Sequence, residues 1–494
     1  MAPLLPLFFV LLQSPIDSAV GRFYDARWFD PAPAWVQRNG ITRQATALLD
    51  VVADADREGL DPADYLTPTL ESLLHGDLTF DDAWQLDTLL TRTFFLYARD
   101  VSYGRVEPAL VDSQWTRSAR SMDLAALLEM ALDAEQVAPI LRDLVPSQSG
   151  YTALRDAMGR YRDVAQHGGW PVPLGARLAA EGYDTTAGVP AALRRFQELH
   201  GLEPDGILGS ATRTQLRISA ATRARQIALN LERWRWLPRS LGSRYVVVNS
   251  AAFVLELVEN GAVTFTTRAI VGRPDWPTPI ASSRATDIIF RPVWNVPRTI
   301  AVQELLPIIR RDSTYLTREG FRVLGDSSQP QAIDWATVTE STFVYQLAQE
   351  PGPDNPLGGM KLVFWTPFSV FIHDTPVRLS FSERWRAFSH GCIRVEEAGA
   401  LAALLLPAWS VDSIAAAMGR GRQRWVRLPQ PIPVHLVYWT AWVAEDGLVA
   451  FAGDPYGWDE KLASALHARS AQRLTMKGEP VRHLDLRPRW LARR

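Results

Sequence analysis

Hydrophobic positions recur at helical spacing through the first third of the chain. One set runs from Ala45 to Ala53 and another from Leu86 to Tyr97, with apolar residues repeating every three or four positions. Gly59-Leu60-Asp61-Pro62 interrupts this pattern as a break between helices. No motif of catalytic or ligand-binding residues occurs in this part. We therefore predict a helical scaffold domain over residues 21–166.

A short helical unit follows the scaffold. Leu193, Phe196 and Leu199 share one face of a predicted helix that ends at Gly201. Pro204-Asp205-Gly206 then supplies a turn before a further helix. We place this unit at residues 167–220 and a linking helix at residues 221–243.

The pattern changes from helical spacing to alternation at Arg244. Tyr245–Asn249 is a β-branched run, and Asn260-Gly261 predicts a hairpin turn between two alternating segments. The predicted domains that follow are a mostly-β domain at 244–410, which contains an insertion at 298–345, and a C-terminal extension at 411–494 that packs on the other domains. The chain is thus predicted to be a multidomain α+β protein.

Composition narrows the classes of function. The formal net charge is only −2 over 494 residues, which gives no indication of a nucleic-acid partner. The single cysteine excludes an intramolecular disulfide and a zinc site built on paired cysteines. With 47% apolar residues the chain can bury a large core, so it needs no structural metal to fold.

The N-terminus carries an apolar run from Leu4 to Leu12. This run is too short to span a bilayer, and it fits the apolar region of a secretory signal with Ser18-Ala19-Val20 as a cleavage candidate. No basic residue precedes it. We interpret residues 1–20 either as a signal segment or as a segment that packs on the fold, and we expect membrane attachment only if this segment stays uncleaved.

The chemistry is concentrated in Ser389-His390-Gly391-Cys392-Ile393-Arg394-Val395. A second histidine, His373, precedes Cys392 by 19 residues at the end of a predicted strand. A cysteine reacts as its thiolate, and a neighbouring histidine can take the proton. Gly391 keeps the backbone uncrowded for donors that stabilise a carbonyl anion. A helix is expected at 396–405, and its N-terminal dipole would favour the thiolate modestly.

Other interpretations of Cys392 have less support. A phosphatase loop needs an arginine six residues after the cysteine, and position 398 is alanine. A metal site of His373, His390 and Cys392 would lack a second thiolate and would need a carboxylate or water as its fourth ligand. A lone cysteine is otherwise a small buried hydrophobic residue. The pattern favours a cysteine nucleophile that uses no metal or other cofactor.

These residues resemble the signature of the YkuD-type L,D-transpeptidases, an upstream histidine followed by Ser/Thr-His-Gly-Cys, a hydrophobic residue and often arginine. The resemblance extends to the large Gram-negative subtype through Asn355-Pro356-Leu357-Gly358, Lys361 and Arg386-Ala387-Phe388. That subtype has a helical scaffold, one peptidoglycan-binding module and a β catalytic domain, in the order predicted above. The unit at 167–220 resembles such a module, and the alternative is a three-helix connector without a ligand. The resemblance implies that the insertion at 298–345 is a cap over the site, and the alternative is a packed decoration.

The resemblance implies a role for each residue of the site. Cys392 would attack the carbonyl between the third and fourth residues of a donor stem tetrapeptide, release D-alanine, and pass the acyl group to an acceptor amine in a 3→3 cross-link. His373 would be the general base, and His390 and Gly391 would shape the oxyanion site. Arg394 is expected to be either a clamp for a substrate carboxylate or part of a structural ion pair. Ser389 and Asn355 are assigned to substrate binding, with a structural role as the alternative for Ser389.

The resemblance also implies a periplasmic monomer whose partners are peptidoglycan stem peptides and whose thiol carbapenems modify. Two alternatives stay open. The first is a carboxypeptidase or endopeptidase that uses the same thiol with water as the acceptor. The second is a wall-binding scaffold protein without activity, against which the intact pair of His373 and Cys392 argues.

Overall fold

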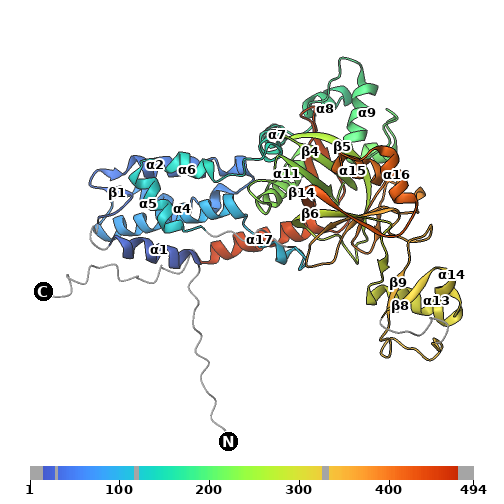
Figure 1. Cartoon of the computed structure of the whole chain (residues 1–494). Helices are drawn as coiled ribbons and strands as arrows, with labels where there is room; N and C mark the ends of the chain where they lie inside the picture. The colour runs from blue at the N-terminus through green and yellow to red at the C-terminus, as the bar shows by residue number, and fades with distance from the viewer. Residues whose placement is uncertain (1–14, 28–31, 116–121, 325–332, 477–494) are drawn as a thin grey trace, which may run out of the picture.

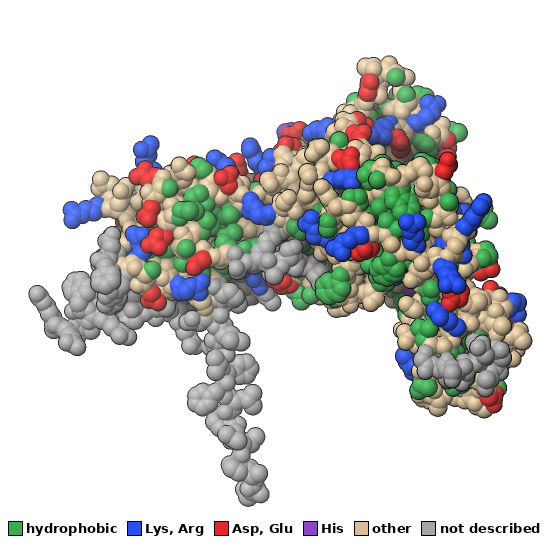
Figure 2. All heavy atoms as spheres, in the orientation of Figure 1, with side chains coloured by type: hydrophobic (Ala, Val, Ile, Leu, Met, Phe, Trp, Pro, Cys, Tyr) green, Lys and Arg blue, Asp and Glu red, His purple; other side chains and the backbone are tan. Residues whose placement is uncertain are grey.

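The structure is a computed structural model of the chain, and it describes residues 15–27, 32–115, 122–324 and 333–476. The helical scaffold and the β-rich part lie end to end, and two smaller lobes project from the β-rich part (Figure 1). Figure 2 shows acidic and basic side chains intermixed on the visible face, in keeping with the near-zero net charge.

The scaffold is a bundle of helices around one apolar core, as predicted. Its long helix α4 (Phe80–Tyr103) starts at a capping box formed by Thr79 and Asp82. Phe94 and Phe95 of α4 are fully buried. The remaining elements are α2 (Arg43–Ala53), α3 (Pro68–His75), α5 (Leu124–Asp133), α6 (Val137–Asp143), and the short strands β1 (Val36–Gln37) and β2 (Gly40–Ile41).

Helix α1 (Pro15–Ala26) packs its apolar face into the scaffold core. Its buried residues are Ile16, Ala19, Val20 and Phe23. The predicted boundary at residue 20 is therefore wrong, because cleavage at Ser18–Val20 would cut a packed helix and remove core side chains. The run from Leu4 to Leu12 lies outside the described residues. No helix in the described part of the chain is long and apolar enough to cross a membrane.

The small unit after the scaffold is organised by one buried side chain, Gln197. Its amide nitrogen lies 2.8 Å from Asp205 Oδ1 and 3.1 Å from Thr212 Oγ1, and its oxygen accepts the Gly206 N–H at 2.7 Å. These contacts tie α9 (Val189–Leu199) to α10 (Ser210–Leu216) and to the turn between them, and α8 (Leu174–Glu181) packs against α9. Helices α7 (Ser149–Gln166) and α11 (Ala220–Arg235) flank the unit and pack on each other, and α11 is the predicted linking helix.

The β-rich part is built on one nine-stranded mixed sheet in the order β12-β5-β13-β11-β10-β6-β14-β3-β4. Strand β5 also pairs with β4 at the far end, so the sheet curls back on itself. The predicted hairpin turn between β4 and β5 is confirmed, with positive φ at both Asn260 and Gly261. The strands are β3 (Arg244–Asn249), β4 (Val254–Glu259), β5 (Ala262–Gly272), β6 (Ala281–Phe290), β10 (Met360–Phe364), β11 (Ile372–His373), β12 (Ala387–Ser389), β13 (Ile393–Val395) and β14 (Arg424–Val437).

The cap is a lobe with its own core of buried side chains, among them Ile309, Leu316, Trp335 and Leu347. Its sheet contains β7 (Trp294–Asn295), β8 (Phe321–Leu324) and β9 (Gln346–Gln349), and its helices are α12 (Arg298–Ile300), α13 (Leu306–Arg311) and α14 (Tyr315–Arg318). Between α12 and α13 the chain forms a π-helical turn, η4 (Ala301–Leu305). Such turns are frequent at functional sites.

The interpretation of residues 411–494 as a packed extension is wrong for β14, which lies inside the sheet between β6 and β3. Helices α15 (Ala398–Leu405) and α16 (Val411–Gly419) precede it, and β15 (Ala441–Val443), β16 (Val449–Phe451) and α17 (Trp458–Met476) follow. Helix α17 runs back toward the scaffold (Figure 1), where Ser470 Oγ lies 2.6 Å from Arg105 Nη2. The C-terminal part therefore completes the sheet and also joins it to the scaffold.

Candidate active site

Two adjacent strands place the predicted histidine and cysteine on one face of the sheet. Strands β11 and β13 are parallel neighbours in which Ile372 pairs with Ile393 and His373 pairs with Arg394. Both isoleucines are fully buried in the core. Because successive side chains of a strand point to opposite faces, His373, Cys392 and Arg394 lie together on the other face.

Strand β10 adds Lys361 to this face. Lys361 stands directly opposite His373 in the antiparallel pair of β10 and β11. Its ammonium lies 3.4 Å from the centroid of the Phe371 ring, and Phe371 is the neighbour of Cys392 in the register of β11 and β13. Lys361, His373 and Arg394 therefore form a row that crosses three strands beside the thiol.

The contacts of His373 leave one ring nitrogen free to accept a proton. Its Nδ1 lies 2.6 Å from the carbonyl oxygen of Asp374. A carbonyl only accepts, so Nδ1 carries the hydrogen and Nε2 keeps its lone pair. Burial lowers the pKa of His373 to about 3, and the positive charges of Arg394 and Lys361 act in the same direction. The imidazole is therefore neutral at pH 7.

Burial raises the pKa of the Cys392 thiol, while the Phe371 N–H and the charges of Lys361 and Arg394 oppose this rise. The prediction that a helix dipole favours the Cys392 thiolate is wrong. Strand β13 separates Cys392 from α15, whose first residue is Ala398. A dipole acts only near the first turn. Burial of both groups therefore favours a neutral thiol beside a neutral imidazole over a thiolate–imidazolium ion pair.

Residues 389–392 form a loop that we call the nucleophile loop after the role predicted for Cys392, and hydrogen bonds within it set the position of Cys392. Gly391 has a φ of +101°, which strongly favours glycine. Ser389 Oγ donates to the Cys392 carbonyl oxygen at 2.5 Å and accepts the Gly391 N–H at 3.1 Å. Ser389 is buried, so these contacts support a structural role and contradict its assignment to substrate binding. In the described part of the chain no backbone oxygen accepts a hydrogen bond from the Cys392 N–H, so this donor remains available to a group bound beside the thiol.

Two further residues hold the loop from below, and sequence reasoning missed both. Thr278 Oγ1 donates to the Gly391 carbonyl oxygen at 2.8 Å and accepts the Gly272 N–H at 2.9 Å. Tyr456 Oη donates to the Gly272 carbonyl oxygen at 2.7 Å and accepts the Thr278 N–H at 3.3 Å. Thr278 and Tyr456 lie far from Cys392 in the sequence and belong to no motif, so no sequence signal connected them with the site.

His390 contacts the cap. Its Nε2 lies 2.5 Å from Glu304 Oε1 on the π-helical turn η4, and its ring packs edge-on against Trp276 at a centroid distance of 4.4 Å. Arg273 Nη1 lies 3.9 Å from the same carboxylate. Glu304 therefore connects the cap to the nucleophile loop, a contact that sequence reasoning also missed.

The two interpretations of Arg394 can now be compared. In the described part of the chain no carboxylate forms an ion pair with Arg394, and its buried Nε has no hydrogen-bond partner. Of the two interpretations, this arrangement favours the substrate clamp.

Asn355 has a structural role. It is buried, and its Nδ2 lies 3.1 to 3.3 Å from three backbone carbonyl oxygens, those of Pro292, Gln349 and Glu350. Its Oδ1 accepts the Leu357 N–H at 2.9 Å. All of these bonds are internal to the loops at the base of the cap, and they contradict the assignment of Asn355 to substrate binding.

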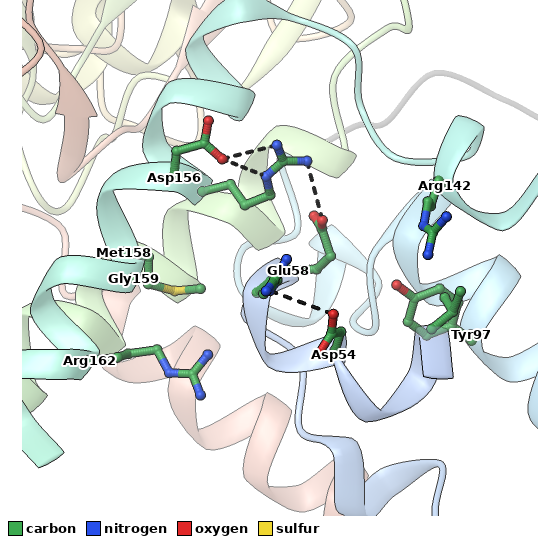
Figure 3. Close-up of a pocket in the computed structure, with 11 residues that line it drawn as sticks. Asp54, Glu58, Tyr97, Arg142, Asp156, Met158, Gly159 and Arg162 are labelled. Carbon is green, nitrogen blue, oxygen red and sulfur yellow. Dashed lines mark hydrogen bonds and ion pairs between the residues drawn. The ribbon is translucent and has the colours of Figure 1, made fainter. Parts of the chain in front are cut away.

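A cavity of about 440 Å³ lies away from this site, between the scaffold and α7 (Figure 3). Its charged side chains largely satisfy one another: Arg155 bridges Glu58 and Asp156, and Arg162 pairs with Asp56. No cysteine or histidine lines it, so it offers neither a thiol nor an imidazole. Among the described residues no group of three or more His, Cys, Asp or Glu side chains is placed to hold a metal ion.

Family models match three parts of the chain. Residues 243–412 match the L,D-transpeptidase catalytic domain of the YkuD family. Residues 18–158 match a scaffold domain, and residues 176–216 match a domain described as "Putative peptidoglycan binding domain". The chain therefore carries a catalytic domain of the YkuD L,D-transpeptidase family together with scaffold and peptidoglycan-binding domains, which confirms the family predicted from the sequence.

A Haemophilus influenzae protein named "Putative L,D-transpeptidase" is 30% identical over 242 residues. The match covers 48% of this chain and 48% of that protein, so about half of the relative is matched. Among solved structures, an L,D-transpeptidase from Mycobacterium smegmatis is 18% identical over 40% of this chain and 58% of its own, with a TM-score of 0.21. L,D-transpeptidase 3 from Mycobacterium tuberculosis, in complex with a faropenem-derived adduct, is 12% identical over 39% and 60%, with a TM-score of 0.21.

Proposed function

We propose that this protein is an L,D-transpeptidase that forms 3→3 peptidoglycan cross-links through a thioester at Cys392. The observation that carries the proposal is the placement of Cys392 and a neutral His373 on one face of adjacent strands. The Asp374 carbonyl orients the imidazole so that Nε2 can accept the thiol proton. The family match and the peptidoglycan-binding domain support peptidoglycan as the substrate and the periplasm as the location.

The first half-reaction forms the acyl-enzyme. His373 Nε2 takes the proton of Cys392 as the sulfur attacks the carbonyl between the third and fourth residues of a donor tetrapeptide. The oxyanion forms beside the unpaired Cys392 N–H, at a backbone oriented by the positive φ of Gly391 and next to His390. The carbon–nitrogen bond then breaks, and the amine of D-alanine leaves with the proton from His373. A thioester remains on Cys392.

The second half-reaction transfers the acyl group to an amine of a neighbouring stem peptide. That amine attacks the thioester and gives a proton to His373. The carbon–sulfur bond breaks, and the sulfur of Cys392 takes the proton back. Water in place of the amine would give a tripeptide and no cross-link, which is the hydrolase alternative. The two reactions differ only in the acceptor.

The test is incubation of the full chain with purified disaccharide-tetrapeptide, followed by mass spectrometry. We expect dimers that have lost one D-alanine, with a 3→3 linkage in the fragment spectrum. Tripeptide monomers alone would support the hydrolase, and unchanged substrate would support the non-catalytic scaffold.

The matched control is Cys392→Ala, which should lose all turnover while keeping the same near-ultraviolet circular dichroism. A carbapenem should add its mass to the peptide that contains Cys392 in the unsubstituted protein and not in the variant. Cross-linking by the folded Cys392→Ala protein, or an adduct on a serine, would show that the nucleophile is wrong.

A further inference from the structure

The row beside the thiol contains two cations that form no ion pair with a carboxylate of the described chain. Lys361 makes its closest charge contact with the Phe371 ring, and Arg394 has a buried Nε without a partner. Neither forms an ion pair with a described residue, although both are largely shielded from solvent.

Buried charges in proteins are normally paired, because an unpaired charge loses its hydration without compensation. Three other buried arginines have carboxylate partners within 3.0 Å: Arg177 with Glu181, Arg233 with Asp459, and Arg235 with Glu232. A fourth, Arg223, has no carboxylate partner, but two amide oxygens, those of Gln215 and Gln226, accept its hydrogen bonds. The exception at Lys361 and Arg394 therefore indicates a position for an anion that arrives with a ligand.

The acidic side chains near the row are already engaged. Asp374 accepts hydrogen bonds from Arg378 Nη2 and from the Gly359 N–H, both at 2.7 Å. Glu304 lies 2.5 Å from His390 Nε2, and its charge acts on Arg394 without forming an ion pair with it. An external anion is thus the available partner for both cations.

The strand register places the two cations on either side of His373, on the strands that flank β11. Neighbouring strands are about 4.8 Å apart, so the two backbones are separated by about 10 Å, a distance that a lysine and an arginine can bridge toward one group. Both charges act on Cys392 and on His373, so an anion between them would lie next to the reacting atoms.

We propose that Lys361 and Arg394 together bind the terminal carboxylate of the donor residue that leaves when Cys392 is acylated. This inference rests on the proposed function and adds the recognition of the donor end. The carboxyl carbon of that residue stands three covalent bonds from the attacked carbonyl carbon, closer than any other carboxylate of the stem peptide. The arginine offers a planar fork of donors and the lysine a point charge, a combination suited to a carboxylate.

The experiment measures donor binding without turnover, in full-length protein that carries Cys392→Ala. Isothermal titration with disaccharide-tetrapeptide should show binding weakened about ten- to hundredfold by Lys361→Met, the range for a charge-assisted hydrogen bond. Lys361→Arg should recover most of the affinity. Lys461→Met, which removes an exposed lysine on α17, is the matched control and should bind like the parent.

Two modified donors identify which carboxylate is bound. A donor with an amidated C-terminus should bind the parent as weakly as the normal donor binds Lys361→Met, and Lys361→Met should weaken it no further. A donor with lysine in place of diaminopimelate should keep the full effect of Lys361→Met. If Lys361→Met weakened binding of the normal donor but not of this lysine-containing donor, the cations would bind the side-chain carboxylate of diaminopimelate.

The proposal would be overturned if amidation and Lys361→Met each weakened donor binding additively, or if neither weakened it. Because binding is measured in the Cys392→Ala background, a failure of the proposed transpeptidation would not alter this result.

Discussion

Replacing Thr278 with valine would remove one hydroxyl from beneath the nucleophile loop with little change in side-chain shape. Thr278 is fully buried, and its hydroxyl serves two backbone groups, the Gly391 carbonyl and the Gly272 N–H. Each buried group left without a partner costs about 1–3 kcal/mol, so Thr278→Val should destabilise the closed loop by about 2–6 kcal/mol. Even the lower value would make an opened loop about 30-fold more populated.

An open loop should change two measurements in opposite directions. Cys392 would be exposed, and burial would no longer raise its pKa, so alkylation by iodoacetamide at pH 7 should become at least several-fold faster. Transpeptidation should fall by about 100-fold, because displacement of a reacting atom by about 1 Å has that order of effect.

Thr278→Ser keeps the hydroxyl and should stay within a few-fold of the parent in both assays. Circular dichroism checks that the valine variant remains folded. If folded Thr278→Val alkylates and cross-links at the parent rates, then the hydroxyl does not hold the loop.

Two further predictions follow from the electrostatics of the site. The alkylation rate of the free protein should rise about tenfold per pH unit from pH 7 to 9, without a step near pH 6. The reason is that burial raises the pKa of Cys392 and lowers that of His373 to about 3. A plateau below pH 8 would instead indicate a resting ion pair between the two residues. Glu304→Ala should lower kcat/KM about two- to fivefold, since the Glu304 carboxylate positions the His390 ring through one partly exposed contact. Glu304→Gln should recover part of the loss, and equal rates in all three proteins would remove Glu304 from any positioning role.

The pairing of His373 with Cys392 was predictable because both residues belong to a short motif with a recognisable spacing. The loop between them is long enough to bring the two residues onto neighbouring strands. The scaffold helices and the hairpin at Asn260-Gly261 were predictable for a similar reason, since their signals are local periodicity and turn chemistry.

The rest of the site depends on contacts between distant segments. Thr278 and Tyr456 meet beneath Gly391 although 178 positions separate them. Ser389 and Asn355 sit inside or near motifs, but only their burial and hydrogen bonds show that they hold loops. The helix dipole was expected at Cys392 because the short strand β13 was not foreseen between the motif and α15.

The position of β14 has a consequence for how the chain folds during synthesis. The catalytic match ends at residue 412, yet β14 (Arg424–Val437) is an interior strand, and Tyr456 reaches back to the Gly272 carbonyl beside the nucleophile loop. During synthesis the nucleophile would leave the ribosome well before the strand that closes its sheet. Pairing between such distant segments is slow to form. A nascent chain would therefore hold Cys392 in an incomplete sheet until β14 and Tyr456 have emerged, so the site can assemble only after this later segment is made.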